Sequence, residues 1–328
     1  MKLKPVNEQT IVITGATSGI GLATAQLAAK KGAKLVLAAR SEADLQQVAQ
    51  DLGGEVATVV ADVANPDDVR RIAETAQQRF GGFDTWVNNA GVGIVGLIEQ
   101  GSLEDYRKLF DTNFWGVVNG SLEALKHLKQ RGGSLINLGS EVSDVAVPLQ
   151  GIYSASKHAI KGFTNALRAE LEHEKAPVSV TLIKPAGINT LFIQNARNYL
   201  DREPKLPAPV YAPEEVANAI VHAAANSQRD IYVGGGGKFA SSLNKLAPSA
   251  MDWVNANIMP GQEVRPDEAP KHPQGGLHQP GIGGKVHGDY PGYVFKKSYY
   301  TRASMHPVIS GALLALAGGA AALWLSKK

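Results

Sequence analysis

Short apolar runs rich in β-branched residues alternate with amphipathic stretches along the first 235 or so residues of the chain. The apolar runs predict seven strands, at 10–14, 34–38, 56–60, 85–88, 134–138, 179–183 and 230–233. Helical spacing of apolar residues predicts helices between them, at 20–31, 42–52, 66–80, 103–130, 153–175 and 213–226. Strands with few polar residues, each followed by a helix, indicate a seven-stranded parallel sheet covered on both faces. Right-handed crossovers then give a doubly wound α/β fold.

The pattern changes after residue 237 and divides the chain into four parts. Residues 1–237 form the main domain. Residues 238–259 predict a helical extension. Residues 260–305 are rich in Pro and Gly and predict an irregular, mobile linker. Residues 306–328 predict a C-terminal apolar helix.

The C-terminal segment 308–325 has no charged side chain, and its length is near the lower limit for a helix that crosses a bilayer. Gly311, Ala315 and Gly319 form a stripe of small residues suited to close helix packing. We therefore expect a membrane anchor. Because the N-terminus lacks an apolar signal segment, we expect the main domain in the cytoplasm. The alternative is a helix docked on a partner subunit.

Composition and charge narrow the function classes. The chain of 328 residues has a net charge of +3 and no long basic run, so we expect no nucleic-acid partner. It has no cysteine, which excludes disulfides, thiolate metal ligands and cysteine nucleophiles. No metal site is expected.

A glycine-rich turn, TGATSGIG at 14–21, joins the first predicted strand to the first predicted helix. Gly15 permits a tight turn, Gly19 lets the backbone approach a pyrophosphate, and Gly21 allows the helix to pack closely on the sheet. The free N–H groups at the helix N-terminus would face the phosphates. With a strand before it and a helix after it, this pattern predicts a dinucleotide site rather than a purely structural turn.

The spacing of these glycines resembles the short-chain dehydrogenase/reductase family, and the resemblance extends over residues 8–235. It implies a Rossmann-like fold and hydride transfer with a nicotinamide cofactor. One departure is Ala186, which precedes Gly187 where the family usually has Pro-Gly. The positions that match cofactor-binding residues of the family are Gly15, Thr17, Ser18, Gly19, Ile20, Gly21, Arg40, Asp62, Val63, Asn89, Ala90, Gly91, Tyr153, Lys157, Pro185, Gly187, Ile188 and Thr190.

The end of the second predicted strand indicates which dinucleotide is bound. An acidic residue here would bind the ribose hydroxyls of NAD, but the strand is followed by Ala39 and Arg40. The guanidinium group of Arg40 can pair with a 2′-phosphate, and in the family an arginine at this position accompanies NADP. We therefore expect NADP(H) as the cofactor. A solvated surface arginine is the alternative interpretation of Arg40.

Four residues suggest the chemistry. Tyr153 and Lys157 lie four positions apart and so share a helix face, where an ammonium group would make the phenol more acidic and a better proton donor. Ser140 follows the fifth strand and can bind the substrate oxygen. Asn113 resembles the family's helical asparagine, which holds a water in the proton path. Each residue alone has an ordinary structural explanation, but their combination and order favour catalysis.

The substrate pocket should lie between residues 142–152 and 191–212, which are largely apolar and indicate an apolar or lipid-like carbonyl or alcohol substrate. Packing of these loops against the domain is an equally strong interpretation. By resemblance, the helices at 103–130 and 153–175 would form a dimer or tetramer interface. Two other functions stay open: a non-catalytic NADPH-binding scaffold or redox sensor tethered to a membrane, and an oxidising dehydrogenase that uses NAD.

Overall fold

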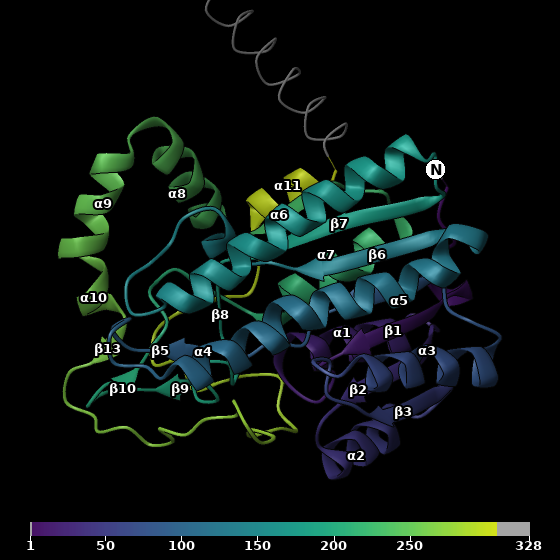
Figure 1. The fold of residues 1–328 in the computed structure, drawn as a ribbon, viewed down its shortest axis with the longest axis horizontal. Coiled ribbons are helices and arrows are strands. Elements are labelled where there is room, and N and C mark those ends of the chain that lie inside the picture. Colours follow the sequence, from purple (N-terminus) through teal and green to yellow (C-terminus); the bar gives the residue numbers. More distant parts are fainter. Residues whose placement is uncertain (1, 307–328) are drawn as a thin grey trace, which may run out of the picture.

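The computed structural model describes residues 2–306, and a parallel β-sheet forms its centre (Figure 1). The strand order is β12-β7-β6-β4-β1-β2-β3, and every neighbouring pair is parallel. The strands are β1 Thr10–Thr14, β2 Lys34–Ala39, β3 Val56–Val60, β4 Thr85–Asn88, β6 Gly133–Leu138, β7 Val178–Pro185 and β12 Asp230–Val233. The predicted Rossmann-like α/β fold with seven parallel strands is therefore confirmed.

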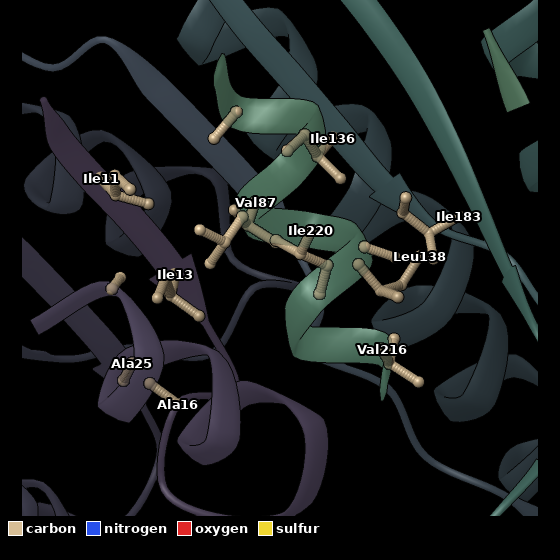
Figure 2. Packing of buried hydrophobic residues seen from close by; sticks show 14 of the residues in the cluster. Ile11, Ile13, Ala16, Ala25, Val87, Ile136, Leu138, Ile183, Val216 and Ile220 are labelled. Atoms are coloured by element: carbon tan, nitrogen blue, oxygen red, sulfur yellow. The ribbon is translucent and has the colours of Figure 1, made fainter. Parts of the chain in front are cut away.

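Two hydrophobic layers hold helices on both faces of the sheet, because successive strand side chains point to opposite faces. In β1, Ile11 and Ile13 enter one layer and Val12 enters the other. The first layer packs under helices α1 Gly19–Lys30, α2 Glu42–Leu52 and α7 Pro213–Ala225. The second packs under α3 Pro66–Phe80, α5 Gly116–Arg131 and α6 Gly151–His173. Figure 2 shows part of the first layer, where strand residues such as Ile136 and Ile183 lie beside Val216 and Ile220 of α7.

The helix predicted at 103–130 is interrupted. Helix α4 Leu103–Phe110 runs into a π-helical turn, Asp111–Trp115, before α5 begins. Because the apolar pattern continues across the interruption, the sequence does not reveal it. The turn moves Asn113 to a fully buried position behind the cleft described below.

The helical extension is also divided. The structure has α8 Gly235–Leu246, α9 Pro248–Asn257 and α10 Met259–Gln262, which form an arm at the left of Figure 1. Pro248 lacks a backbone N–H and so begins a new helix rather than continuing the old one.

The segment expected to be a mobile linker packs against the main domain instead. We call residues 263–292 the strap. Its backbone is irregular, as expected, but Leu277 is fully buried in a cluster with Val92, Ile94 and Leu109. The strap is drawn in yellow-green below β9 and β10 in Figure 1. The sequence does not predict these contacts, because apolar periodicity does not reveal a coil held by long-range contacts.

One short two-residue ladder lies at the start of the strap and another lies just after its end. Strand β13 Val264–Arg265 pairs with β10 Glu203–Pro204, and β14 Val294–Phe295 pairs with β11 Val210–Tyr211. Strand β11 also pairs with β8 Gly187–Ile188. A separate ladder joins β5 Ile94–Val95 to β9 Arg197–Asn198.

Helix α11 Tyr299–Met305 ends the described part of the chain beside β12. The hydroxyl of Thr301 accepts from the Gly234 N–H at 3.1 Å and donates to the Tyr232 carbonyl at 3.2 Å. The apolar segment that was predicted to anchor the chain lies outside the described residues. Among residues 2–306, no helix combines the length and apolarity that a membrane crossing requires.

Candidate active site

A cleft opens at the carboxyl ends of the strands. After β1 the chain adds β2 and β3 on one side of β1, and it then crosses over to add β4 on the other side. In open α/β sheets this reversal creates the crevice in which ligands bind. The predicted site residues line this single cleft, with the exceptions of Gly21 and Asn113. Those that line it are Gly15, Thr17, Ser18, Gly19, Ile20, Arg40, Asp62, Val63, Asn89, Ala90, Gly91, Ser140, Tyr153, Lys157, Pro185, Gly187, Ile188 and Thr190.

The glycine turn needs its glycines for backbone reasons. Gly15 and Gly19 have φ values of +65° and +52°, which side-chain-bearing residues rarely adopt. A Cβ atom on Gly15 would lie 2.8 Å from the Ala90 Cα, and one on Gly21 would collide with the Gly15 carbonyl oxygen. Gly21 therefore acts from behind the cleft by allowing α1 to begin against the turn.

Residues just after β4 also hold the glycine turn in place. The side-chain amide of Asn89 donates to the Thr14 and Gly15 carbonyl oxygens at 2.9 and 3.0 Å. The Thr14 hydroxyl accepts from the backbone N–H groups of Asn89 and Ala90. These bonds hold the loop after β4 beside the glycine turn, so both lie on the same wall.

Tyr153 and Lys157 face the cleft one turn apart on α6. The Lys157 Nζ lies 5.6 Å from the centroid of the Tyr153 ring and donates to the Leu138 carbonyl at 2.8 Å. Lys157 is only 5% exposed, and this burial lowers its pKa to about 8. Burial raises the pKa of Tyr153, a hydrogen bond with Ser140 lowers it, and the negative charge of Glu141 raises it further.

Ser140 begins the short helical turn after β6. Its hydroxyl accepts from the Val142 N–H at 3.3 Å and contacts the Pro185 carbonyl at 3.5 Å. With its bond to Tyr153, this places a hydroxyl and a phenol together at the same side of the cleft. Such a pair can bind one substrate oxygen between them.

Asn113 lies behind Lys157 and does not line the cleft. Its amide donates to the Val92 carbonyl at 2.9 Å and to the Ser156 hydroxyl at 3.2 Å, and its oxygen accepts from the Val92 N–H at 2.8 Å. The side chain thus ties α6 to the loop after β4. A Cβ on Gly91 would lie 3.4 Å from the Asn113 oxygen and 4.0 Å from the Lys157 Nζ, so all three are neighbours.

Arg40 lies at the end of β2 and contacts the strap. Its guanidinium group donates to the carbonyl oxygens of Gly276 and Leu277, the latter at 3.1 Å. Burial lowers the pKa of Arg40, and the nearby charge of Asp62 raises it. These contacts use two of the five N–H groups of the guanidinium group, and the other three make no protein hydrogen bond within residues 2–306.

The strap forms one wall of the cleft, which the sequence analysis missed. Gly276, Pro280, Gly281, Ile282 and Gly283 line it. The only available signal was the density of Gly and Pro in this stretch, because glycines permit a close approach of one backbone to another.

Two side chains of the main domain hold the strap in place. Asp105 accepts from His278 at 2.6 Å, and also from Tyr199 and Arg197. Burial alone would raise the pKa of Asp105, but these hydrogen bonds outweigh it and lower the pKa. The Asn195 amide makes two bonds with the backbone of Ile282, at 2.8 and 2.9 Å.

The other end of the cleft is mainly apolar. Within the two segments predicted to form the pocket, eight residues line it: Val142, Val147, Gln150, Leu191, Phe192, Asn195, Leu206 and Pro207. Val145, Leu149, Ile193, Gln194 and Arg197 do not, so packing explains part of these two segments. The structure adds Glu141 and Met259 to this wall.

Comparisons with known proteins agree with this architecture. A family model described as short chain dehydrogenase matches residues 9–200. An uncharacterized oxidoreductase of Bacillus subtilis, YxnA, is 44% identical over 323 residues, which cover 96% of this chain and 90% of that protein. The 11-beta-hydroxysteroid dehydrogenase A of Sesamum indicum is 34% identical over 262 residues, covering 75% of this chain and 74% of that protein.

A solved structure shares the fold. The short chain dehydrogenase/reductase of Burkholderia phymatum, in complex with NAD, has a TM-score of 0.67 and 27% identity, covering 76% of this chain and 96% of that one. The chain therefore belongs to the short-chain dehydrogenase/reductase family of oxidoreductases. The match to YxnA includes the strap, whereas the family model ends before it.

Proposed function

We propose that this chain is an NADP(H)-dependent oxidoreductase that transfers a hydride between nicotinamide and a carbonyl or alcohol carbon of an apolar substrate. One observation carries the proposal: Ser140, Tyr153 and Lys157 line the same cleft as the glycine turn. A proton donor and an anchor for the dinucleotide must meet at one place for this reaction. A scaffold that only binds a dinucleotide has no need of the phenol and the ammonium group together.

The residues present suit a dinucleotide. The turn brings the N-terminus of α1 to the cleft, where the positive end of the helix would stabilise a pyrophosphate. A Cβ on Gly19 would lie 3.0 Å from the Thr190 side chain, so only glycine leaves this passage open. When bound, the nicotinamide ring supplies or accepts the hydride.

Tyr153 protonates the carbonyl oxygen during reduction and takes the proton back during oxidation. Burial alone raises the pKa of the phenol, so the site must supply positive charge. The Lys157 ammonium, whose Nζ lies 5.6 Å from the ring centroid, would supply that charge and favour the phenolate form of Tyr153. Ser140 holds the substrate oxygen beside the phenol, and Asn113 completes the proton path behind Lys157.

Arg40 supports a preference for NADP(H). It lines the cleft at the end of β2, and the preceding Ala39 offers no carboxylate to a ribose hydroxyl. A guanidinium group there can bind a 2′-phosphate through its three remaining N–H groups and can stack on adenine. The Burkholderia relative was solved with NAD, so the choice between the two dinucleotides is tested directly below.

We also infer that the chain forms a homo-oligomer through α4, α5 and α6. Leu103, Trp115 and Leu122 are large apolar side chains that are 70%, 51% and 54% exposed in the monomer. Light scattering of the parent and of Trp115→Asp would test this, with a dimer or tetramer expected for the parent and dissociation for the variant.

A panel of apolar ketones and alcohols, followed by nicotinamide absorbance with NADPH and NADP, tests the function. Oxidation of NADPH by at least one ketone is the expected result. Stoichiometric binding of NADPH without turnover of any compound would instead favour the scaffold.

A further inference from the structure

Glu141 is a carboxyl group in the cleft that the proposed chemistry does not use. It follows Ser140 directly and lines the cleft together with Ser140 and Tyr153. Its side chain makes no hydrogen bond or ion pair with any residue between 2 and 306. Asp144, three residues further on, pairs with both Lys161 and Lys184.

The surroundings of Glu141 leave the cleft as its open side. A Cβ on Gly237, in the first turn of α8, would lie 2.6 Å from the Glu141 Oε2 and 2.8 Å from its Cβ. The backbone of α8 therefore covers one side of the side chain. The rest of this end of the cleft is formed mainly by apolar side chains, among them Val142, Phe192 and Met259.

An unpaired carboxyl group among apolar walls is costly, and burial raises the pKa of Glu141 to about 7. The charged form also disfavours the reaction, because its negative charge raises the pKa of Tyr153. A ligand group that donates a hydrogen bond to Glu141 would offset the cost of the unpaired carboxyl group, and an ammonium group would also offset its negative charge. An entirely apolar ligand would leave the carboxyl group unpaired.

We propose that Glu141 is a specificity-determining residue that binds a hydrogen-bond donor, a hydroxyl or an ammonium group, on an otherwise apolar carbonyl substrate. The inference rests on the proposed function and deepens it by naming the substrate class. Sites built to bond a polar substrate group reject analogues that lack it, because the polar group of the protein is then left unpaired.

The test uses three ketones of equal size that differ only at the end away from the carbonyl, where they carry a hydroxyl, an ammonium or a methyl group. For the parent enzyme we expect kcat/KM to be about 10- to 100-fold higher for the hydroxyl or the ammonium ketone than for the methyl ketone. The better of the two donors identifies the natural group.

Two variants locate the effect. Glu141→Gln keeps the size and one acceptor oxygen but removes the charge, so it should lose any preference for ammonium and keep part of a preference for hydroxyl. Glu141→Leu should favour the methyl ketone. Asp44→Asn is the matched control, because Asp44 is a carboxylate that lines the same cleft from α2, and it should leave the substrate preference as in the parent.

The outcomes separate this inference from the function on which it rests. Reduction of all three ketones with equal kcat/KM, unchanged in both Glu141 variants, would overturn the role of Glu141 and leave the oxidoreductase in place. If none of the three ketones is reduced, although the enzyme binds NADPH, the proposed function itself fails. If Glu141→Leu does not fold, as judged by circular dichroism, Glu141→Gln decides the question through the ammonium-to-hydroxyl ratio.

Discussion

The backbone N–H of Gly19 donates a hydrogen bond of 2.9 Å to the carbonyl oxygen of Lys285. Gly19 belongs to the glycine turn after β1, and Lys285 belongs to the strap near the end of the described chain. The Gly284 N–H returns a bond to the Thr17 carbonyl at 2.9 Å. The strap thus closes over the turn at which we expect a pyrophosphate, so a dinucleotide should exchange only when the strap moves.

Weakening the strap should speed cofactor release. His278→Ala removes the bond to Asp105 and should raise the dissociation rate of NADPH about three- to tenfold, since such a bond contributes about 1 kcal/mol. Stopped-flow displacement measures the rate. Lys271→Ala is the control, because Lys271 lies in the strap but pairs only at the surface with Glu268. Equal rates in parent and His278→Ala would show that the strap does not limit exchange.

Arg40 should distinguish the two dinucleotides. Arg40→Met removes the proposed 2′-phosphate contact and also the two bonds to the strap. Loss of the strap contacts affects NADPH and NADH alike, whereas loss of the phosphate contact affects NADPH alone. We therefore expect the ratio of the two Kd values to shift against NADPH by about 10- to 100-fold, measured by fluorescence titration. An unchanged ratio would remove the assignment of NADP(H).

Lys157 should lower the free energy of unfolding at neutral pH. Burial lowers its pKa to about 8, below the value of about 10.4 in an unfolded chain. The unfolded chain therefore binds more protons between these pH values, and stability should rise with pH across this window and be lowest below pH 8. Lys157→Met should gain about 1–3 kcal/mol at pH 7 while losing activity. Urea denaturation at pH 7 and pH 10 measures both effects, and a destabilised variant at pH 7 would contradict this account.

Asp144 should raise the free energy of unfolding at neutral pH, and this contribution should disappear in acid. Burial alone would raise its pKa, but hydrogen bonds from Lys161 and Tyr232 and the charge of Lys184 outweigh it and lower the pKa to about 2. The stabilisation is therefore complete above about pH 4 and disappears as the pH falls towards 2. Asp144→Asn leaves Lys184 buried without its partner and should cost about 3–5 kcal/mol at pH 7.

The control for Asp144 is Asp67→Asn, which breaks an exposed pair with Arg70 and should cost less than about 1 kcal/mol. Denaturant titrations at pH 7 and pH 3 compare the three proteins. If both variants lose the same free energy of unfolding at pH 7, the buried pair of Asp144 and Lys184 contributes no more than an exposed ion pair.

The strands and most of the cleft could be predicted because both depend on local pattern. Short apolar runs such as 10–14 are recognisable strands, and residues at strand ends meet at one edge of a parallel sheet. The sequence does not predict that Gly21 and Asn113 lie behind the wall of the cleft and do not line it. Their role depends on close packing and on the π-helical turn.

The strap and Glu141 could not be predicted from local pattern. The strap has no apolar period, and its position follows from single long-range contacts such as buried Leu277 and the Arg40 bonds. Glu141 reads as a polar residue at the start of a turn. Only the structure shows that its side chain has no ion-pair or hydrogen-bond partner among residues 2–306 and that it lines the cleft.

Tyr153→Phe tests whether the phenol of Tyr153 transfers a proton beside a bound dinucleotide. With a ketone that the parent reduces, we measure single-turnover oxidation of NADPH together with the Kd of NADPH. We expect a loss in rate of about 10²- to 10⁴-fold, with the Kd changed less than about threefold. A variant that oxidises NADPH at the parent rate would contradict it.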